Sequence, residues 1–94
     1  MPILRRVNDG EGSSGSLVEA FEMDSEGKTT IVGDTPMIGY YLIVGTITAS
    51  TYSTRDWWMT TPITEFIEEK EENKEYYLKF KTINSEYEFW GTKK

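Results

Sequence analysis

The chain has 94 residues, carries 10 Lys and Arg against 16 Asp and Glu for a formal net charge of −6, and contains neither cysteine nor histidine. A chain of this length has room for one small core, and its composition excludes disulfides, Cys or His metal sites, thiol nucleophiles and imidazole general bases. Its 13 aromatic residues are too many for a disordered chain. We therefore expect one folded domain that holds no metal or cofactor and is not an enzyme.

Residues 1–16 are expected to be a flexible segment ahead of a single β-rich domain over 17–94. A short apolar start, Ile3, Leu4 and Val7, precedes residues 8–16, which hold three glycines, three serines and no apolar side chain. This is the composition of a flexible linker.

No membrane segment is expected. The N-terminus lacks the apolar stretch of a signal peptide, and the longest nearly apolar run, residues 37–45, is about half of the ~20 residues that a membrane-spanning helix needs. The sequence thus predicts a cytoplasmic protein.

Two segments concentrate the negative charge. Residues 11–34 hold six acids against one lysine, and residues 65–75 hold six glutamates against two lysines. Because such a surface repels a polyanion, nucleic acid is disfavoured as a partner and a protein with a basic surface is favoured. Monomer and homo-oligomer both stay open.

Short extended runs begin at Leu17. Residues 17–23 and 28–32 are joined by Asp24-Ser25-Glu26-Gly27, a connection typical of a hairpin. Residues 40–48 follow as a β-branched and aromatic run with apolar side chains on both faces, which predicts a central strand.

The cluster Arg55-Asp56-Trp57-Trp58 supplies the candidate binding residues. Adjacent side chains of a strand point to opposite faces, so Trp57 and Trp58 cannot both enter one core. Trp and Arg are enriched at interface hot spots. We expect one tryptophan to anchor in a partner, with Arg55 and Tyr52 fixing its orientation; the alternative is that one ring fills the core and the other covers a neighbouring loop.

Residues 61–83 admit two interpretations. Thr61-Pro62 could open a helix over 61–74, but Lys70, Glu71 and Lys74 interrupt its apolar stripe. Two strands, 63–69 and 75–83, fit better, because Tyr76, Leu78 and Phe80 alternate with lysines. A turn at Asn84-Ser85 then leads into a strand over 86–90.

Six to seven short strands predict an all-β fold, a small antiparallel barrel or two-layer roll. If the helix at 61–74 forms instead, the fold is α+β.

The C-terminal third contains Trp58-Met59-Thr60-Thr61-Pro62-Ile63, an acidic spacer, and Lys81-Thr82-Ile83-Asn84-Ser85-Glu86-Tyr87-Glu88-Phe89. It resembles the ending of small uncharacterised proteins of phages and bacterial mobile elements, which have a Trp-x-Thr/Ser-x-Val/Ile strand and a Lys-Thr-x-Asn-Ser-x-Tyr hairpin. The resemblance implies the hairpin over 63–83 and a phage-type protein that binds a host factor.

The leading hypothesis is therefore a non-enzymatic binding protein, an inhibitor of phage or mobile-element type that occupies a host protein. One alternative is a module that sequesters a small ligand or nucleotide, with aromatic rings stacking a base and Arg55 meeting a phosphate. Another is a structural or assembly subunit that joins its neighbours through edge strands.

Overall fold

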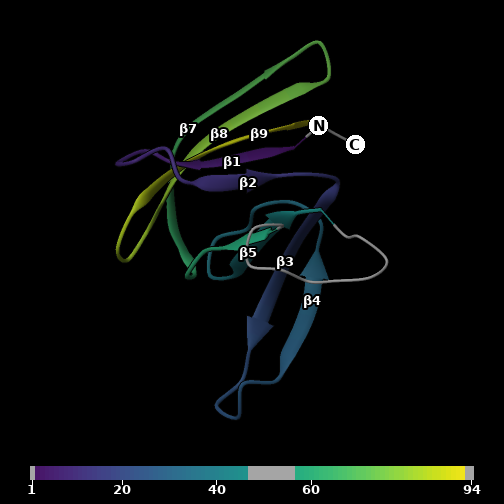
Figure 1. Cartoon of the computed structure of the whole chain (residues 1–94), viewed down its shortest axis with the longest axis vertical. Coiled ribbons are helices and arrows are strands. Elements are labelled where there is room, and N and C mark those ends of the chain that lie inside the picture. Colours follow the sequence, from purple (N-terminus) through teal and green to yellow (C-terminus); the bar gives the residue numbers. More distant parts are fainter. Residues whose placement is uncertain (1, 47–56, 93–94) are drawn as a thin grey trace.

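The computed structural model describes residues 2–46 and 57–92, and the fold within them is all-β (Figure 1). The strands are β1 (Ile3–Arg6), β2 (Gly12–Ser14), β3 (Leu17–Met23), β4 (Thr29–Gly33), β5 (Tyr41–Gly45), β6 (Trp57–Met59), β7 (Ile63–Glu72), β8 (Glu75–Thr82) and β9 (Glu86–Thr92). They form two antiparallel sheets, of order β2-β1-β9-β8-β7 and β4-β3-β5-β6. The sheets pack as a two-layer roll and do not close into a barrel. None of the described segments is a helix that could cross a membrane.

The five-stranded sheet confirms the hairpin over residues 63–83 and rules out the helix at 61–74. Strands β7 and β8 pair from Ile63↔Thr82 to Glu72↔Glu75. The turn between them is the two residues Asn73 and Lys74, both with positive φ (50° and 69°), as a type I′ turn requires. Strand β9 then pairs with β8 in unbroken register.

The four-stranded sheet contains the expected first hairpin and central strand. Five residues, Asp24 to Lys28, connect β3 and β4. Gly27 has a φ of 83° in this turn, and the backbone N–H of Asp24 donates to the Lys28 carbonyl. Strand β5 lies between β3 and β6. It covers the first part of the expected run, and residues 47 and 48 lie outside the described residues.

Residues 2–16 do not form the flexible segment that was expected over 1–16. Strand β1 pairs with β9 along its whole length, and β2 pairs with β1, so the N-terminus completes the five-stranded sheet. Leu4 is fully buried. The glycines serve close approach: a Cβ on Gly12 would lie 2.0 Å from the Leu4 carbonyl oxygen, and one on Gly15 would lie 2.1 Å from that of Gly45. These two additional strands also explain why the described residues contain nine strands where six to seven were expected.

Both sheets contribute to one core. Its buried members are Leu4, Leu42, Val44, Ile63, Leu78, Phe80, Tyr87 and Phe89. Phe80 and Tyr87 stack at 5.5 Å between ring centroids. The alternation of β8 puts Leu78 and Phe80 into this core, as the sequence pattern predicts, and Tyr76 continues the same face towards the sheet edge.

Candidate functional site

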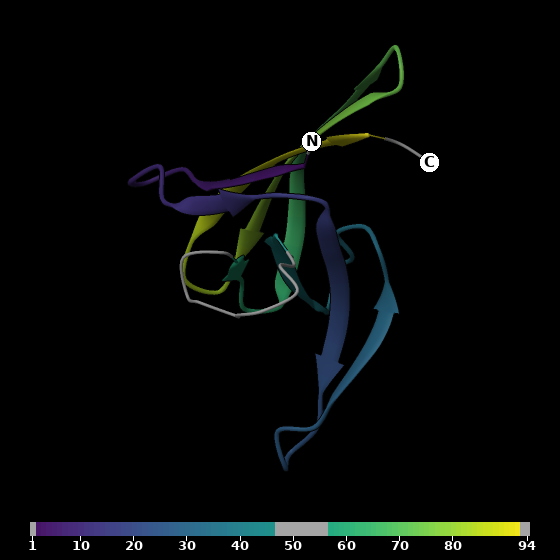
Figure 2. The same cartoon turned by 45° about the vertical axis from the view of Figure 1, so that its right-hand side comes forward.

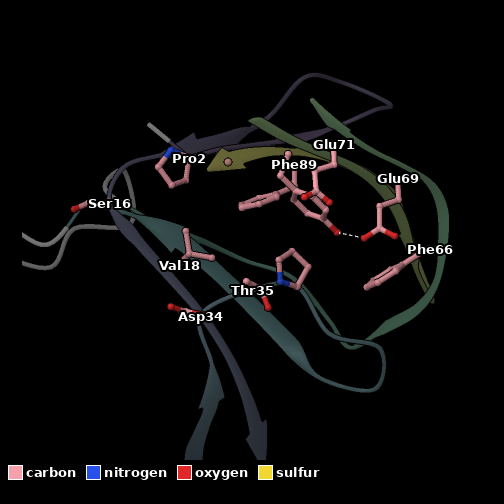
Figure 3. Close-up of a pocket in the computed structure, with 12 residues that line it drawn as sticks. Pro2, Ser16, Val18, Asp34, Thr35, Phe66, Glu69, Glu71 and Phe89 are labelled. Atoms are coloured by element: carbon pink, nitrogen blue, oxygen red, sulfur yellow. Dashed lines mark hydrogen bonds between the residues drawn. The ribbon is translucent and has the colours of Figure 1, made fainter. Parts of the chain in front are cut away.

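A cleft of about 910 Å³ opens beside the core (Figure 3). Its wall combines apolar and aromatic residues with acids and two hydroxyl side chains. The lining residues are Pro2, Ser16, Val18, Asp34, Thr35, Pro36, Phe66, Glu69, Glu71, Tyr76, Phe89 and Gly91. They come from both sheets and from the connection after β4, so the cleft exists only in the folded roll.

Strand alternation explains which residues face the cleft. On β7, Glu69 is opposite Leu78 and Glu71 is opposite Tyr76, whereas Lys70 is opposite Tyr77. Directly opposed residues share a face of the sheet, so the two glutamates lie on the inner face and Lys70 lies on the outer one. The Glu-Lys-Glu run therefore contributes two carboxylates to the cleft and keeps its lysine on the opposite face of the sheet.

The aromatic part of the wall is formed by Tyr76 and Phe89, whose rings meet edge to face at 6.4 Å and 62°. Phe89 lies close to its own strand, since a Cβ on Gly91 would come within 2.9 Å of its ring. Phe66 and Pro36 add apolar surface. A bound group would therefore contact rings and aliphatic carbon inside the cleft.

The acidic part of the wall is organised around a hydrogen bond. Tyr76 donates its hydroxyl to Oε2 of Glu69 at 2.5 Å, the dashed contact in Figure 3. Burial and the neighbouring Glu69 raise the pKa of Tyr76, so the phenol keeps its proton at neutral pH. Asp34 and Glu71 supply two further carboxylates, and among the described residues neither lysine nor arginine lines the cleft. Its charge is therefore negative.

This chemistry suits a ligand with an apolar stem and a cationic head. Aromatic faces attract cations, and carboxylates form strong charge-assisted hydrogen bonds with ammonium and guanidinium groups. A phosphate would meet three carboxylates, and none of the described residues that line the cleft is a lysine or arginine. Within residues 2–46 and 57–92, no group of three or more acidic side chains is arranged to hold a metal ion.

The two candidate tryptophans lie on opposite faces of β6. Trp58 is opposite Val44 and packs against the core, and Trp57 is opposite Gly45 on the other face. Both rings are half-buried. Trp58 donates its Nε1–H to the Tyr87 hydroxyl at 3.2 Å, and the Arg6 guanidinium lies 5.0 Å from the centroid of its ring.

Arg6 is itself held by an ion pair with Asp9. This pair lowers the pKa of the Asp9 carboxyl, chiefly through the side-chain hydrogen bond. Trp58 thus connects β6 to β1 and β9. The other two candidates, Tyr52 and Arg55, lie outside the described residues.

Sequence reasoning missed the cleft. The alternation at Tyr76-Tyr77 does predict one ring on each face, and Tyr76 lines the cleft while Tyr77 meets Trp90 at 5.5 Å on the other side. Glu69 and Glu71, however, belong to a run that resembles a solvated hairpin tip. Their spacing of two is the signal that places both on one face.

The comparisons with known proteins add no relative: no family model, no curated protein and no solved structure matches the chain.

Proposed function

We propose that this chain is a non-enzymatic binding protein that occupies a basic surface of a protein partner and accepts a lysine or arginine side chain in the cleft. The observation that carries the proposal is the wall of the cleft, where rings and prolines lie beside Asp34, Glu69 and Glu71 and where none of the described lining residues is basic. The stem of a lysine or arginine would pack on the apolar wall while its charged head meets the carboxylates.

The rest of the surface favours the same class of partner. The chain carries a net charge of −6, which steers it towards a basic protein and away from nucleic acid. The lack of cysteine and histidine supports a role in binding without catalysis. Together with the resemblance of its C-terminal third to phage-type proteins, this leads us to propose an inhibitor that acts on a host protein in the host cytoplasm.

Glu69 can accept a partner's cation while it binds Tyr76. A carboxylate has about four acceptor positions on its two oxygens, and the Tyr76 hydroxyl uses one of them on Oε2. Tyr76 therefore holds the carboxylate in place and leaves most of its capacity for a ligand. Such positioning reduces the entropy cost of binding.

A small cationic ligand is the second candidate. The cleft volume of about 910 Å³ lies within the range of small-molecule sites, ~300–1,000 Å³. The acidic wall disfavours the nucleotide that Arg55 suggested, because a phosphate would be repelled. A small ligand would contact the cleft alone, whereas a partner protein would also contact the surface around it.

The experiment is an NMR titration of the labelled protein with a Gly-Ser peptide that carries a central arginine, and with the same peptide carrying neutral citrulline. We expect the arginine peptide alone to shift the amides of Glu69, Tyr76 and Phe89, with an affinity that falls as salt rises.

Two adjacent tyrosines provide a matched control. Tyr76 donates to Glu69 in the cleft, and Tyr77 donates to Glu88 at 2.7 Å on the opposite face. Glu69→Gln should weaken the arginine peptide about tenfold, as loss of one charge-assisted hydrogen bond of about 1.5 kcal/mol predicts, and Glu88→Gln should leave it unchanged. Equal binding of both peptides, or equal effects of both variants, would reject the cleft as the site.

A further inference from the structure

Within residues 2–46 and 57–92, strand β4 is an edge of the four-stranded sheet and pairs with β3 alone (Figures 1 and 2). Four of its five residues are exposed and the fifth is half-buried. Ile31 is 63% exposed and Val32 38%. In both views the β3–β4 hairpin extends away from the rest of the molecule. A two-stranded ribbon of this kind is marginal in water without a further strand or a packed face.

The backbone of β4 has free pairing positions. Asp24 donates its N–H to the Lys28 carbonyl at 3.0 Å, which makes these two a hydrogen-bonded pair. Because antiparallel pairs alternate, the next pair that faces β3 is Glu22 with Thr30. The backbone N–H and C=O groups of Thr29 and Ile31 then point away from β3, towards the open edge.

The composition of β4 does nothing to protect that edge. The strand reads Thr-Thr-Ile-Val-Gly and has no charged side chain and no proline. Natural proteins block open edges with charges, prolines, bulges or short strands. Here the one such device is the irregularity opposite Ala20 and Phe21, which lies beyond the pairing positions of Thr29 and Ile31.

We propose that β4 pairs antiparallel with β4 of a second copy of this chain, joining the two four-stranded sheets across a twofold axis. The charges at the two ends of the strand identify this occupant. Lys28 precedes β4 and Asp34 follows it, and antiparallel pairing brings Lys28 of each copy to the end where Asp34 of the partner subunit lies. A parallel arrangement would bring like charges together.

The pairing would also cover apolar area at Ile31, which is exposed, whereas its neighbour Phe21 is already buried. Ile31 is opposite Phe21, and Phe21 stacks on Tyr41 at 5.2 Å, so these three side chains share the outer face. Across the twofold axis Ile31 of both copies would come close together and cover part of the area that each now exposes. Such an isologous contact closes at the dimer and does not propagate.

The test is sedimentation equilibrium of the full chain over a wide concentration range, where we expect a transition from 10.9 kDa to twice that mass. Ile31→Lys should raise the dimer dissociation constant at least ~10-fold, because it puts two like charges together at the axis. The matched control is Ile67→Lys, since Ile67 is an isoleucine on the other long edge strand, β7, and is 45% exposed. It should not change the dissociation constant.

A charge exchange tests the direction of pairing. Lys28→Glu should weaken the dimer, and the double variant Lys28→Glu with Asp34→Lys should restore it, as only an antiparallel contact allows. Circular dichroism would confirm that each variant keeps its sheet content. The proposal is overturned if the chain stays monomeric at the highest concentration, if Ile31→Lys and Ile67→Lys act alike, or if the exchange gives no recovery.

Discussion

The inner faces of the two sheets form one core, whereas their outer faces differ in composition. On the five-stranded sheet, Arg5, Glu88, Lys79 and Glu68 are opposed in register across β1, β9, β8 and β7, a row of alternating charge. On the four-stranded sheet the corresponding rows are Leu17, Gly45 and Trp57, then Glu19, Ile43 and Met59, then Ile31, Phe21 and Tyr41. One outer face thus carries alternating charge. The other is largely apolar, with Leu17 and Phe21 buried and Ile31 and Met59 exposed.

The long edge strands show the same contrast. Strand β7 has six charged residues among ten and two register shifts, and β4 has no charged residue among five. Charge on an edge strand opposes pairing with another chain. The difference teaches that the edge of the five-stranded sheet at β7 is protected by charge, whereas the edge of the four-stranded sheet at β4 is exposed and uncharged.

The largest expected effect concerns the core that both sheets share. Phe80→Ala removes a fully buried ring and should cost about 3–5 kcal/mol of unfolding free energy. Because Leu42 and Val44 of β5 belong to the same cluster, both sheets should unfold together. Denaturation followed by NMR would measure this. Persistence of the β3–β5 signals after the five-stranded sheet has melted would show that the sheets fold separately.

Substitutions of Trp57 and Trp58 test the contrast between the outer and the inner face of β6. Trp58→Ala should cost about 2–3 kcal/mol, because the ring packs on the core and bonds Tyr87. Trp57→Ala should cost less than about 1 kcal/mol. Thermal melts would measure both. Binding of the arginine peptide should be unchanged in Trp57→Ala, and a loss there would return the site to the tryptophan cluster.

The outer face of the five-stranded sheet contains a group that titrates at high pH. Burial and the hydrogen bond to Glu88 raise the pKa of Tyr77 to about 12, against about 10 in the unfolded chain. Between these values the unfolded state binds fewer protons than the folded one, so stability falls as pH rises from 10 to 12. Tyr77→Phe should flatten this decline in urea melts. An unchanged slope would contradict the assignment.

The smallest expected effect compares the two hairpin turns. Lys74 has a φ of 69° where glycine is favoured, and Gly27 has one of 83°. Lys74→Gly should stabilise the protein by about 0.5 kcal/mol, and Gly27→Lys should destabilise it by about 1 kcal/mol. Urea denaturation would resolve the opposite signs. The same sign for both would mean that turn strain is not the controlling factor.

Local patterns sufficed for the main strands after Leu17, but not for β1 and β2 or for the pairing of distant strands. The alternation of Tyr76, Leu78 and Phe80 predicts the inner face of β8, and Asp24 to Gly27 predicts the first turn. The pairing of β1 with β9 joins the first strand to the last, and no short-range pattern encodes it. Glycine and serine in residues 8–16 indicate flexibility from composition, whereas Gly12 and Gly15 are required by close backbone contacts.

The cleft could not be predicted from the sequence for the same reason. Its wall combines residues as distant as Val18, Glu69 and Phe89. Their proximity depends on how the two sheets pack, and that packing follows from the register of strands far apart in sequence. The acidic run of β7 could be read as solvated or as ligand-binding until its partner strand was known.

The contrast between the two edges is tested most directly by amide hydrogen exchange at low and high protein concentration. We predict that the amides of Thr29 and Ile31, which point away from β3, become protected as concentration rises, while those along β7 exchange at a constant rate. Exchange that is independent of concentration at β4, or protection that rises equally on both strands, would contradict the assignment of the four-stranded sheet as the contact side of the molecule.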